Sequence, residues 1–375
     1  MMRLDWMGWP RASPGPPNRL CTFECNLVLA LMFAGMVCMC ALATEEVTPC
    51  VISPPEQRQA IDNVLAGRFG WKVSPALISP VTRPEDPCVS VKDPSIVRYK
   101  DRWHLFCTIR SQKRSHQIEY LSFNDWKNAN SADRHILTLT DGYFCAPQVF
   151  YFTPHQKWYL ICQVADESRK PALQPAYSTT SNIADPSSWT KPVLLFSEQP
   201  GNVNMWIDFW VICDSSRAHL FFTSLDGRMW RSETKLPDFP NGWSQPRVVL
   251  QGDIFEASHV YCLKGLDKFL AVIEAQADGR RYYKAYLADR LDGTWEPLAA
   301  TKEKPFASPA NTQDRETRWT DSFSHGEMIR AGYDQNLEVD PSRLHFLFQG
   351  VSDQARMGKK YGEIPWQLGI LFPGD

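Results

Sequence analysis

The sequence has little net charge, no Asn-x-Ser/Thr sequon and no Cys-x-x-Cys pair after residue 43. Its formal charge of −2 at pH 7 gives no electrostatic reason to expect nucleic acid or a charged membrane surface as a partner. The missing sequon argues against N-glycosylation. Of eleven cysteines, four lie before residue 43, and the remaining seven cannot all pair with one another. Because they lack the Cys/His spacing of a zinc site, we expect those in apolar strands to be small buried hydrophobes.

The first 43 residues have the pattern of a secretory signal peptide. Three arginines precede the uncharged run LVLALMFAGMVCMCALA (27–43), which ends in Ala-x-Ala. A basic leader, an apolar stretch and small terminal residues are typical of a cleaved export signal. The run is close to the length that spans a bilayer, so a retained signal-anchor is the alternative, and a membrane is a partner only in that case. We expect a secreted, extracellular monomer.

The chain repeats itself after a polar spacer over residues 44–70, in which a short helix is expected near 56–67. From residue 71 onward, two apolar strands follow each other across a short turn five times. The second strands of these hairpins are RWHLFCTI (102–109), KWYLICQV (157–164), AHLFFTS (218–224), KFLAVIEA (268–275) and RLHFLFQG (343–350).

A series of tryptophans recurs in step with the hairpins. Its members are Trp71, Trp126, Trp189, Trp243 and Trp295. Short strands and turns repeated at this period are typical of radial architectures, so we predict an all-β fold, a five-bladed β-propeller over residues 71–373. Trp71 precedes the first hairpin whereas the others follow one, so the strand around 71–78 is expected to complete the last blade and latch the ring closed. A β-sandwich is the alternative, but it does not explain the tryptophan register.

The first strands of the predicted blades begin at positions that are mostly polar. These positions are Asp93, Ala146-Pro147-Gln148, Asp208, Glu256 and His325. Equivalent strand starts of a propeller converge at one face of the central channel, so we expect three carboxylates and an imidazole in one cup. Carboxylates at close range acquire different pKa values, which separates an acid from a base. Hydrolysis of a glycosidic bond is the simplest use of such a pair.

Asp208 stands in an apolar neighbourhood, within the segment WIDFW. Burying an unpaired carboxylate is costly, so this side chain must lose its charge or find a partner. Its place among the strand starts explains why it is there.

Seven segments appear in the order found in glycoside hydrolase family 62, which the chain resembles over roughly residues 71–373. They are VKDPSIV, GYFCAPQVFYF, WIDFWVICD, IFEASHVY, DGRRYY, SFSHGEMIR and YGEIPWQLGIL. The resemblance implies a five-bladed propeller that removes α-L-arabinofuranosyl groups from arabinoxylan by an inverting mechanism. It also implies a calcium ion near the channel and no organic cofactor.

Carried over motif by motif, the resemblance implies three catalytic residues. Asp93 is implied as the general base, Glu256 as the general acid, and Asp208 as the residue that orients the acid and modulates its pKa. Phe255 would help Glu256 hold its proton by excluding water, and Lys92 would keep Asp93 ionised.

The resemblance also implies three binding residues. Lys92 and Tyr361 are implied as contacts to arabinose, and His325 as the residue that faces the central calcium ion. Because calcium prefers oxygen ligands, we expect the contact of His325 with the ion to run through water.

Two departures from the family lie in the sugar-contact region. Residues 164–177 read as a charged insertion, and Gly362 stands where the family commonly has Asn. The substrate preference is therefore open, and a related five-bladed hydrolase of another furanoside or xyloside is one alternative. A carbohydrate-binding propeller without activity and a scaffold for protein partners are others. Three carboxylates favour an enzyme, because a binding protein needs no proton donor and acceptor.

Overall fold

The computed structural model describes residues 54–313 and 318–374, which belong to one compact unit. The predicted leader and residues 44–53 of the spacer lie outside the described residues. The short helix expected near 56–67 is present as α1 (Pro54–Leu65). Within the described ranges, no helix combines the length and the apolar character needed to cross a bilayer.

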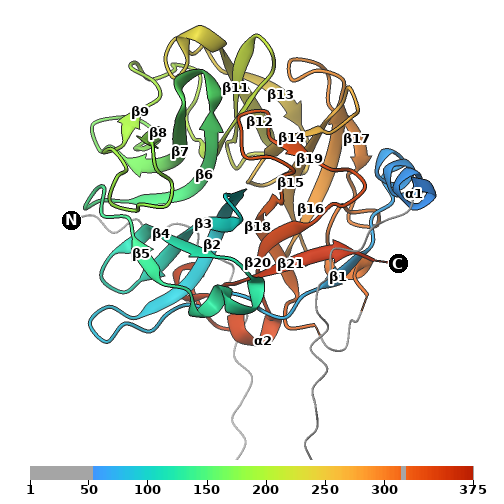
Figure 1. Cartoon of the computed structure of the whole chain (residues 1–375), viewed down its shortest axis with the longest axis horizontal. Coiled ribbons are helices and arrows are strands. Elements are labelled where there is room, and N and C mark those ends of the chain that lie inside the picture. The colour runs from blue at the N-terminus through green and yellow to red at the C-terminus, as the bar shows by residue number, and fades with distance from the viewer. Residues whose placement is uncertain (1–53, 314–317, 375) are drawn as a thin grey trace, which may run out of the picture. The chain divides into compact units, whose positions relative to one another are not determined.

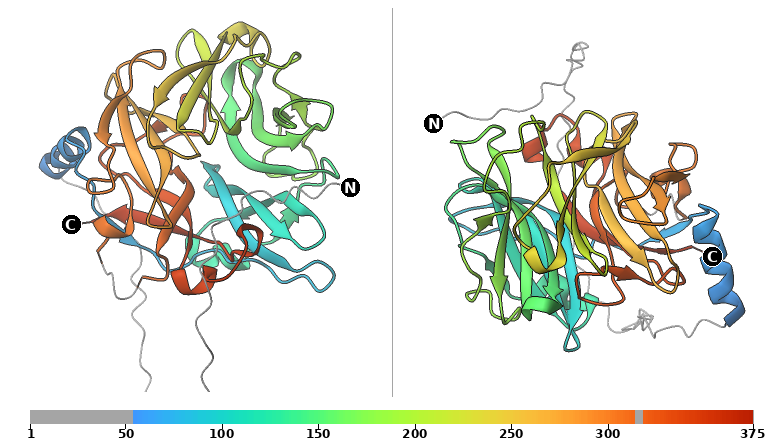
Figure 2. Two further views of the ribbon diagram at one scale, coloured as in Figure 1. Left: turned by 180° about the vertical axis from the view of Figure 1, so that it is seen from behind. Right: turned by 90° about the horizontal axis from the view of Figure 1, so that it is seen from above.

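Five sheets stand around a common centre, so the fold is a five-bladed β-propeller, as predicted (Figure 1). Figure 2 shows the same ring from behind and from above. Blade 1 consists of β2 (Cys88–Tyr99), β3 (Arg102–Ser111), β4 (Ser115–Phe123) and β5 (Arg134–Ile136). Blade 2 consists of β6 (Phe144–Phe152), β7 (Lys157–Ala165), β8 (Leu173–Thr180) and β9 (Val193–Leu194).

The next two blades repeat this strand order, and blade 4 has one added strand at the edge of β14. Blade 3 consists of β10 (Ile207–Cys213), β11 (Arg217–Thr223), β12 (Arg228–Lys235) and β13 (Arg247–Gln251). Blade 4 consists of β14 (His259–Leu263), β15 (Phe269–Ala277), β16 (Arg280–Ala288) and β17 (Glu296–Ala299), with β19 (Glu338–Val339) parallel to β14. Short helices in the connections are η1 (Trp126–Ser131), η2 (Thr153–His155), η3 (Leu236–Asp238), η4 (Pro309–Asn311), α2 (Asp353–Arg356) and η5 (Tyr361–Glu363).

Blade 5 takes its strands from distant parts of the chain. It consists of β18 (Ser322–Met328), β20 (Phe346–Val351), β21 (Gln367–Pro373) and β1 (Trp71–Val73). Trp71 lies opposite Pro373 in the antiparallel pair of β1 and β21, and its indole nitrogen donates to the Phe306 carbonyl at 2.6 Å. A ring-closing latch requires this kind of pairing, and its contribution to stability stays a prediction.

Two tryptophans of the series pack between neighbouring blades. Trp189 of blade 2 meets Phe106 of β3 edge to face, with ring centroids 5.5 Å apart. Trp295 of blade 4 meets Phe221 of β11 in the same way at 5.9 Å. Both contacts reach the preceding blade, so these members of the repeat fill the space between adjacent sheets.

The connection between β18 and β20, residues 329–345, reaches all the other blades. The Arg330 guanidinium donates to carbonyls of β2 and β6 at 2.9 and 2.8 Å. The Gln335 carbonyl accepts from the last amide of β10 at 2.9 Å, and β19 pairs with β14. We call this connection the cross-blade segment.

The described cysteines are small buried groups, as expected from their positions in apolar strands. Five are buried and Cys262 is partly exposed, and none of these six forms a disulfide. The thiols of Cys107 and Cys162 donate to strand carbonyls at 3.7 and 3.5 Å.

Candidate active site

A recurring backbone turn aims the strand starts into the channel. The innermost strands of blades 1, 2 and 3 each contain a β-bulge, and the bulged residue has a positive φ: 48° at Asp93, 50° at Ala146 and 57° at Asp208. Bulges bend a strand and redirect its side chains. Ala257, with a φ of 51°, holds the left-handed position of blade 4, so Glu256 precedes this position by one residue. In blade 5 the bulge falls at His325.

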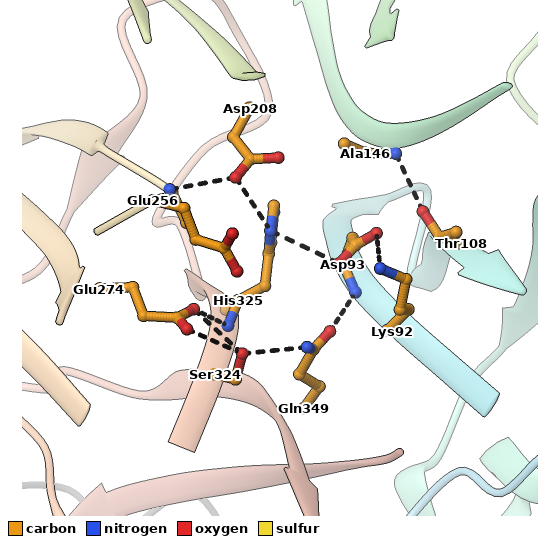
Figure 3. A network of polar contacts seen from close by, with 12 residues as sticks. Lys92, Asp93, Thr108, Ala146, Asp208, Glu256, Glu274, Ser324, His325 and Gln349 are labelled. Atoms are coloured by element: carbon orange, nitrogen blue, oxygen red, sulfur yellow. Dashed lines mark hydrogen bonds and ion pairs between the residues drawn. The ribbon is translucent and has the colours of Figure 1, made fainter. Parts of the chain in front are cut away.

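The structure brings the predicted strand starts together around His325 (Figure 3). The imidazole Nδ1 lies 3.5 Å from Asp93 Oδ1 and 3.8 Å from Asp208 Oδ2. Figure 3 shows Asp93 and Glu256 on opposite sides of the His325 ring. Acid and base catalysis of glycosidic hydrolysis uses two carboxyl groups placed on two sides of the bond that breaks.

Asp93 is held in its ionised form. Lys92 Nζ lies 3.4 Å from its carboxylate, and Gln349 accepts from its backbone amide at 2.8 Å. Burial favours the neutral acid, but the positive charge of Lys92, helped by His325, outweighs it and holds the pKa of Asp93 below its ordinary value. This environment suits a general base and agrees with the role expected for Lys92.

Asp208 lies in the opposite environment. Its carboxylate accepts from the Ala257 amide at 3.2 Å, and its own amide donates to Gln163 at 3.3 Å. Burial, then the charges of Glu256 and Asp93, raise the pKa of Asp208 well above its ordinary value. The Asp208 carboxyl group, which lies among aromatic residues, is therefore stabilised chiefly in its protonated form.

Glu256 has a partner that the sequence reasoning did not assign. Its Oε1 lies 3.0 Å from Nη1 of Arg281, whose guanidinium lies 4.1 Å from the centre of the Phe255 ring. Phe255, which is expected to desolvate Glu256, packs against the Arg281 guanidinium. Arg281 also contacts the buried carboxylate of Glu274 at 2.5 Å.

Lys92 and Tyr361, the predicted sugar contacts, lie together at the edge of the site. Lys92 Nζ lies 3.4 Å from the Tyr361 hydroxyl and 5.3 Å from the centre of its ring. Lys92 is buried, whereas Tyr361, on η5, is 40% exposed. A partly exposed aromatic ring beside a cation is suited to binding a sugar.

A directly coordinated calcium ion does not fit the donors around His325. Among the described residues, no three His, Cys, Asp or Glu side chains are arranged to hold a metal ion. The nearby oxygens of Gln349 and Ser324 accept hydrogen bonds from other protein groups. An ion that keeps most of its water ligands needs fewer protein donors and fits these residues better.

Sequence reasoning missed four polar residues of the site, which are Arg281, Glu274, Ser324 and Gln349. Glu274 is the one with a visible signal, because it is a single acid inside the apolar strand FLAVIEAQA. Burial raises the pKa of Glu274 to about 7, with Arg281 acting against this shift and Glu256 adding to it.

The structure places both departures from the family. The segment 164–177 covers the end of β7, the turn that follows and the first residues of β8; in the turn, Arg169 pairs with Asp166 and donates to the Phe196 carbonyl at 3.0 Å. A Cβ on Gly362 would lie 2.2 Å from the Arg110 guanidinium, so the Arg110 side chain occupies the space that Asn would need.

Comparison with known proteins identifies relatives over most of the chain. Residues 71–372 match the model of Glycosyl hydrolase family 62. The chain is 40% identical over 300 residues to Alpha-L-arabinofuranosidase C of Cellvibrio japonicus. The match covers 78% of this chain and 46% of that protein, so the chain spans about half the length of this curated relative. The catalytic domain of a Coprinopsis cinerea family 62 alpha-L-arabinofuranosidase has a TM-score of 0.76 and 37% identity, covering 82% of this chain and 98% of that one. A family 62 hydrolase solved with xylotriose has a TM-score of 0.76 and 34% identity, covering 83% and 99%.

Proposed function

The chain belongs to glycosyl hydrolase family 62, and from this premise we propose that it is an inverting α-L-arabinofuranosidase that removes arabinose side chains from arabinoxylan. The observation that carries the proposal is the contrast between Asp93, held ionised beside Lys92, and Glu256, which faces it across His325 and lies near the largely protonated Asp208. The relatives named as α-L-arabinofuranosidases support the sugar, and the relative solved with xylotriose supports a xylan backbone.

The proposed reaction moves one proton at each carboxyl group. Asp93 accepts a proton from water while the water oxygen attacks the anomeric carbon of arabinose. Glu256 donates its proton to the xylose oxygen as the glycosidic bond breaks. The attack comes from the face opposite the leaving group, so the configuration at the anomeric carbon inverts. Asp93 ends protonated and Glu256 ionised, and exchange with solvent restores both.

The remaining residues hold and orient these groups. Lys92 and Tyr361 would contact the arabinose ring at the edge of the site. Asp208, mostly neutral and fixed by the Ala257 amide, would act on Glu256 from one side without adding a full negative charge at neutral pH.

The decisive experiment is to incubate the protein with wheat arabinoxylan and to monitor the products by NMR from the first minutes of the reaction. We expect free arabinose that appears first as the β-anomer, because inversion converts an α-linkage into a β-product. Linear arabinan and nitrophenyl xyloside serve as the comparison substrates. Preferential release from either would assign the chain to another specificity, and first appearance of α-arabinose would contradict inversion.

The proposal includes export of the protein and a largely hydrated calcium ion near His325. N-terminal sequencing of protein secreted by an expression host should find the new terminus after Ala43, whereas a retained leader would support the anchor. Removal of calcium with EDTA should lower Tm, and added calcium should restore it. An unchanged Tm would remove calcium from the proposal.

A further inference from the structure

One guanidinium nitrogen serves both the proposed acid and a buried carboxylate behind it. Arg281 Nη1 lies 3.0 Å from Glu256 Oε1 and 2.5 Å from Glu274 Oε1. Glu274 lies in the middle of β15 and has no exposed surface. Arg281 stacks on Phe255, so its position is fixed from two directions.

The other side of Glu274 is connected to the proposed base. Its carboxylate accepts from the Ser324 hydroxyl at 3.0 Å and from the His325 amide at 2.7 Å. Ser324 accepts from Gln349 at 3.0 Å, and Gln349 accepts from the backbone amide of Asp93 at 2.8 Å. Figure 3 shows this chain of hydrogen bonds beneath the imidazole ring. Glu274 therefore connects Arg281, which contacts the proposed acid, with the hydrogen bonds that lead to the proposed base.

We propose that Glu274 is a positioning residue that acts on the reaction through Arg281 and Glu256 without touching the sugar. This inference rests on the proposed function. Glu274 binds the Arg281 guanidinium from behind, and Phe255 packs against its face. Arg281 can therefore hold the Glu256 carboxyl group in the orientation that proton donation to the glycosidic oxygen requires.

The same fold offers a matched control. Glu327 on β18 is also fully buried, and its carboxylate lies 2.7 Å from Arg330 and accepts from the Ile96 amide at 3.2 Å. Glu327→Gln makes the same chemical change in a buried Glu–Arg pair that does not include the proposed acid. A purely structural effect of losing a buried carboxylate should appear in both variants.

The test compares two substrates that depend differently on proton donation. Arabinoxylan has a poor leaving group that needs the acid, and nitrophenyl arabinofuranoside has a good one that needs it much less. Removing a general acid costs about 10²–10⁴-fold, so disturbing its support in Glu274→Gln should lower kcat on arabinoxylan by about 10–100-fold. We expect a loss of at most about threefold on the nitrophenyl substrate, with KM nearly unchanged on both. Glu327→Gln should leave the ratio of the two activities at the wild-type value.

Two further variants keep the inference testable if Glu274→Gln folds poorly. Arg281→Lys retains the charge but loses the planar group that serves two carboxylates, and it should show the same dependence on the leaving group. In a Glu256→Gln background, a second change at Glu274 should have little further effect.

The outcomes separate this inference from the proposed function. Wild-type protein that is inactive on both substrates would contradict the function itself. Active wild-type protein, with equal losses on both substrates for Glu274→Gln and Arg281→Lys, would overturn the positioning role. Wild-type activity in both variants would overturn it as well.

Discussion

Blades 1, 2 and 3 make the same left-handed bulge in the innermost strand, but only two of them carry a carboxylate there. Asp93, Ala146 and Asp208 have φ values of 48°, 50° and 57°. A non-glycine residue in this region costs roughly 1–2 kcal/mol, and blade 2 keeps the turn without gaining an ionisable group from it. The bulge therefore belongs to the repeated fold, and the chemistry depends on which side chain stands on it.

The two aspartates on this shared turn also differ from each other. Lys92 and His325 overcome the effect of burial on Asp93 and lower its pKa, whereas burial and the neighbouring Glu256 raise the pKa of Asp208. Equal backbone geometry thus gives an ionised and a neutral carboxyl group. The neighbours on other strands set the charge state.

The largest expected effect on activity comes from giving the bulge of blade 1 the alanine that stands at the bulge of blade 2. Asp93→Ala removes the proposed base and leaves a side chain that the same turn accepts in Ala146. We expect arabinose release to fall by about 10²–10⁴-fold with the fold intact, and Tm to fall because the buried Lys92 loses its carboxylate partner. Turnover and thermal unfolding measure the two effects. Near-normal turnover would remove Asp93 from the mechanism.

Lys92→Met should reveal how the charge state of Asp93 is set. Without the lysine the pKa of Asp93 rises, and a base must be ionised to act. The acidic limb of the profile of kcat/KM against pH should therefore move to higher pH. Lys100→Met, on the exposed turn after β2, is the control and should leave the limb in place. If the acidic limb of Lys92→Met does not move, Lys92 is not the group that keeps Asp93 ionised.

Asp208→Asn should change how stability depends on pH. The pKa of Asp208 is raised in the folded protein, so the folded state binds this proton more tightly than the unfolded chain does. The wild type should therefore lose stability as pH rises from about 4 toward the folded pKa, and Asn avoids this loss. The Tm of the variant minus that of the wild type should increase between pH 4 and pH 8. Asp101→Asn, on the exposed turn after β2, is the control variant, and a difference for Asp208→Asn that stays constant would contradict the raised pKa of Asp208.

The smallest expected effect is at the bulge that carries no carboxylate. Ala146→Gly relieves the left-handed conformation, so we expect stability to rise by up to about 1 kcal/mol with unchanged activity. Ala176→Gly, within the regular strand β8, should instead destabilise the protein. Loss of activity in Ala146→Gly would show that this turn contributes more than backbone shape.

The repeat made the main features of the site predictable from sequence. Five hairpins and a tryptophan series set the blade register, and that register placed Asp93, Asp208 and His325 at one end of the channel. Glu256 precedes Ala257, the residue with the left-handed conformation in blade 4, by one position. The period of the hairpins locates strands but does not fix the position of a bulge within them.

The supporting residues depend on information that the strand pattern does not contain. Arg281 reaches Glu256 because β16 pairs with β15 in a register that sets Arg281 opposite Gln276. A shift of one residue would turn the side chain to the other face of the sheet. Glu274 was detectable as a lone acid in an apolar strand, by the same reasoning that drew attention to Asp208. Its partners could be identified only once blades 4 and 5 were seen side by side.

The cross-blade segment has a consequence for how the molecule comes apart. A ring of separate sheets could lose one sheet at a time, as repeat proteins do when each unit contacts only its neighbours. Here residues 329–345 leave blade 5, bond to the innermost strands of the four other blades and return to blade 5. Detaching any one sheet from the centre therefore breaks contacts of a strand connection that all five share. We expect a single calorimetric transition, with amides on the innermost strands exchanging hydrogen together through global opening.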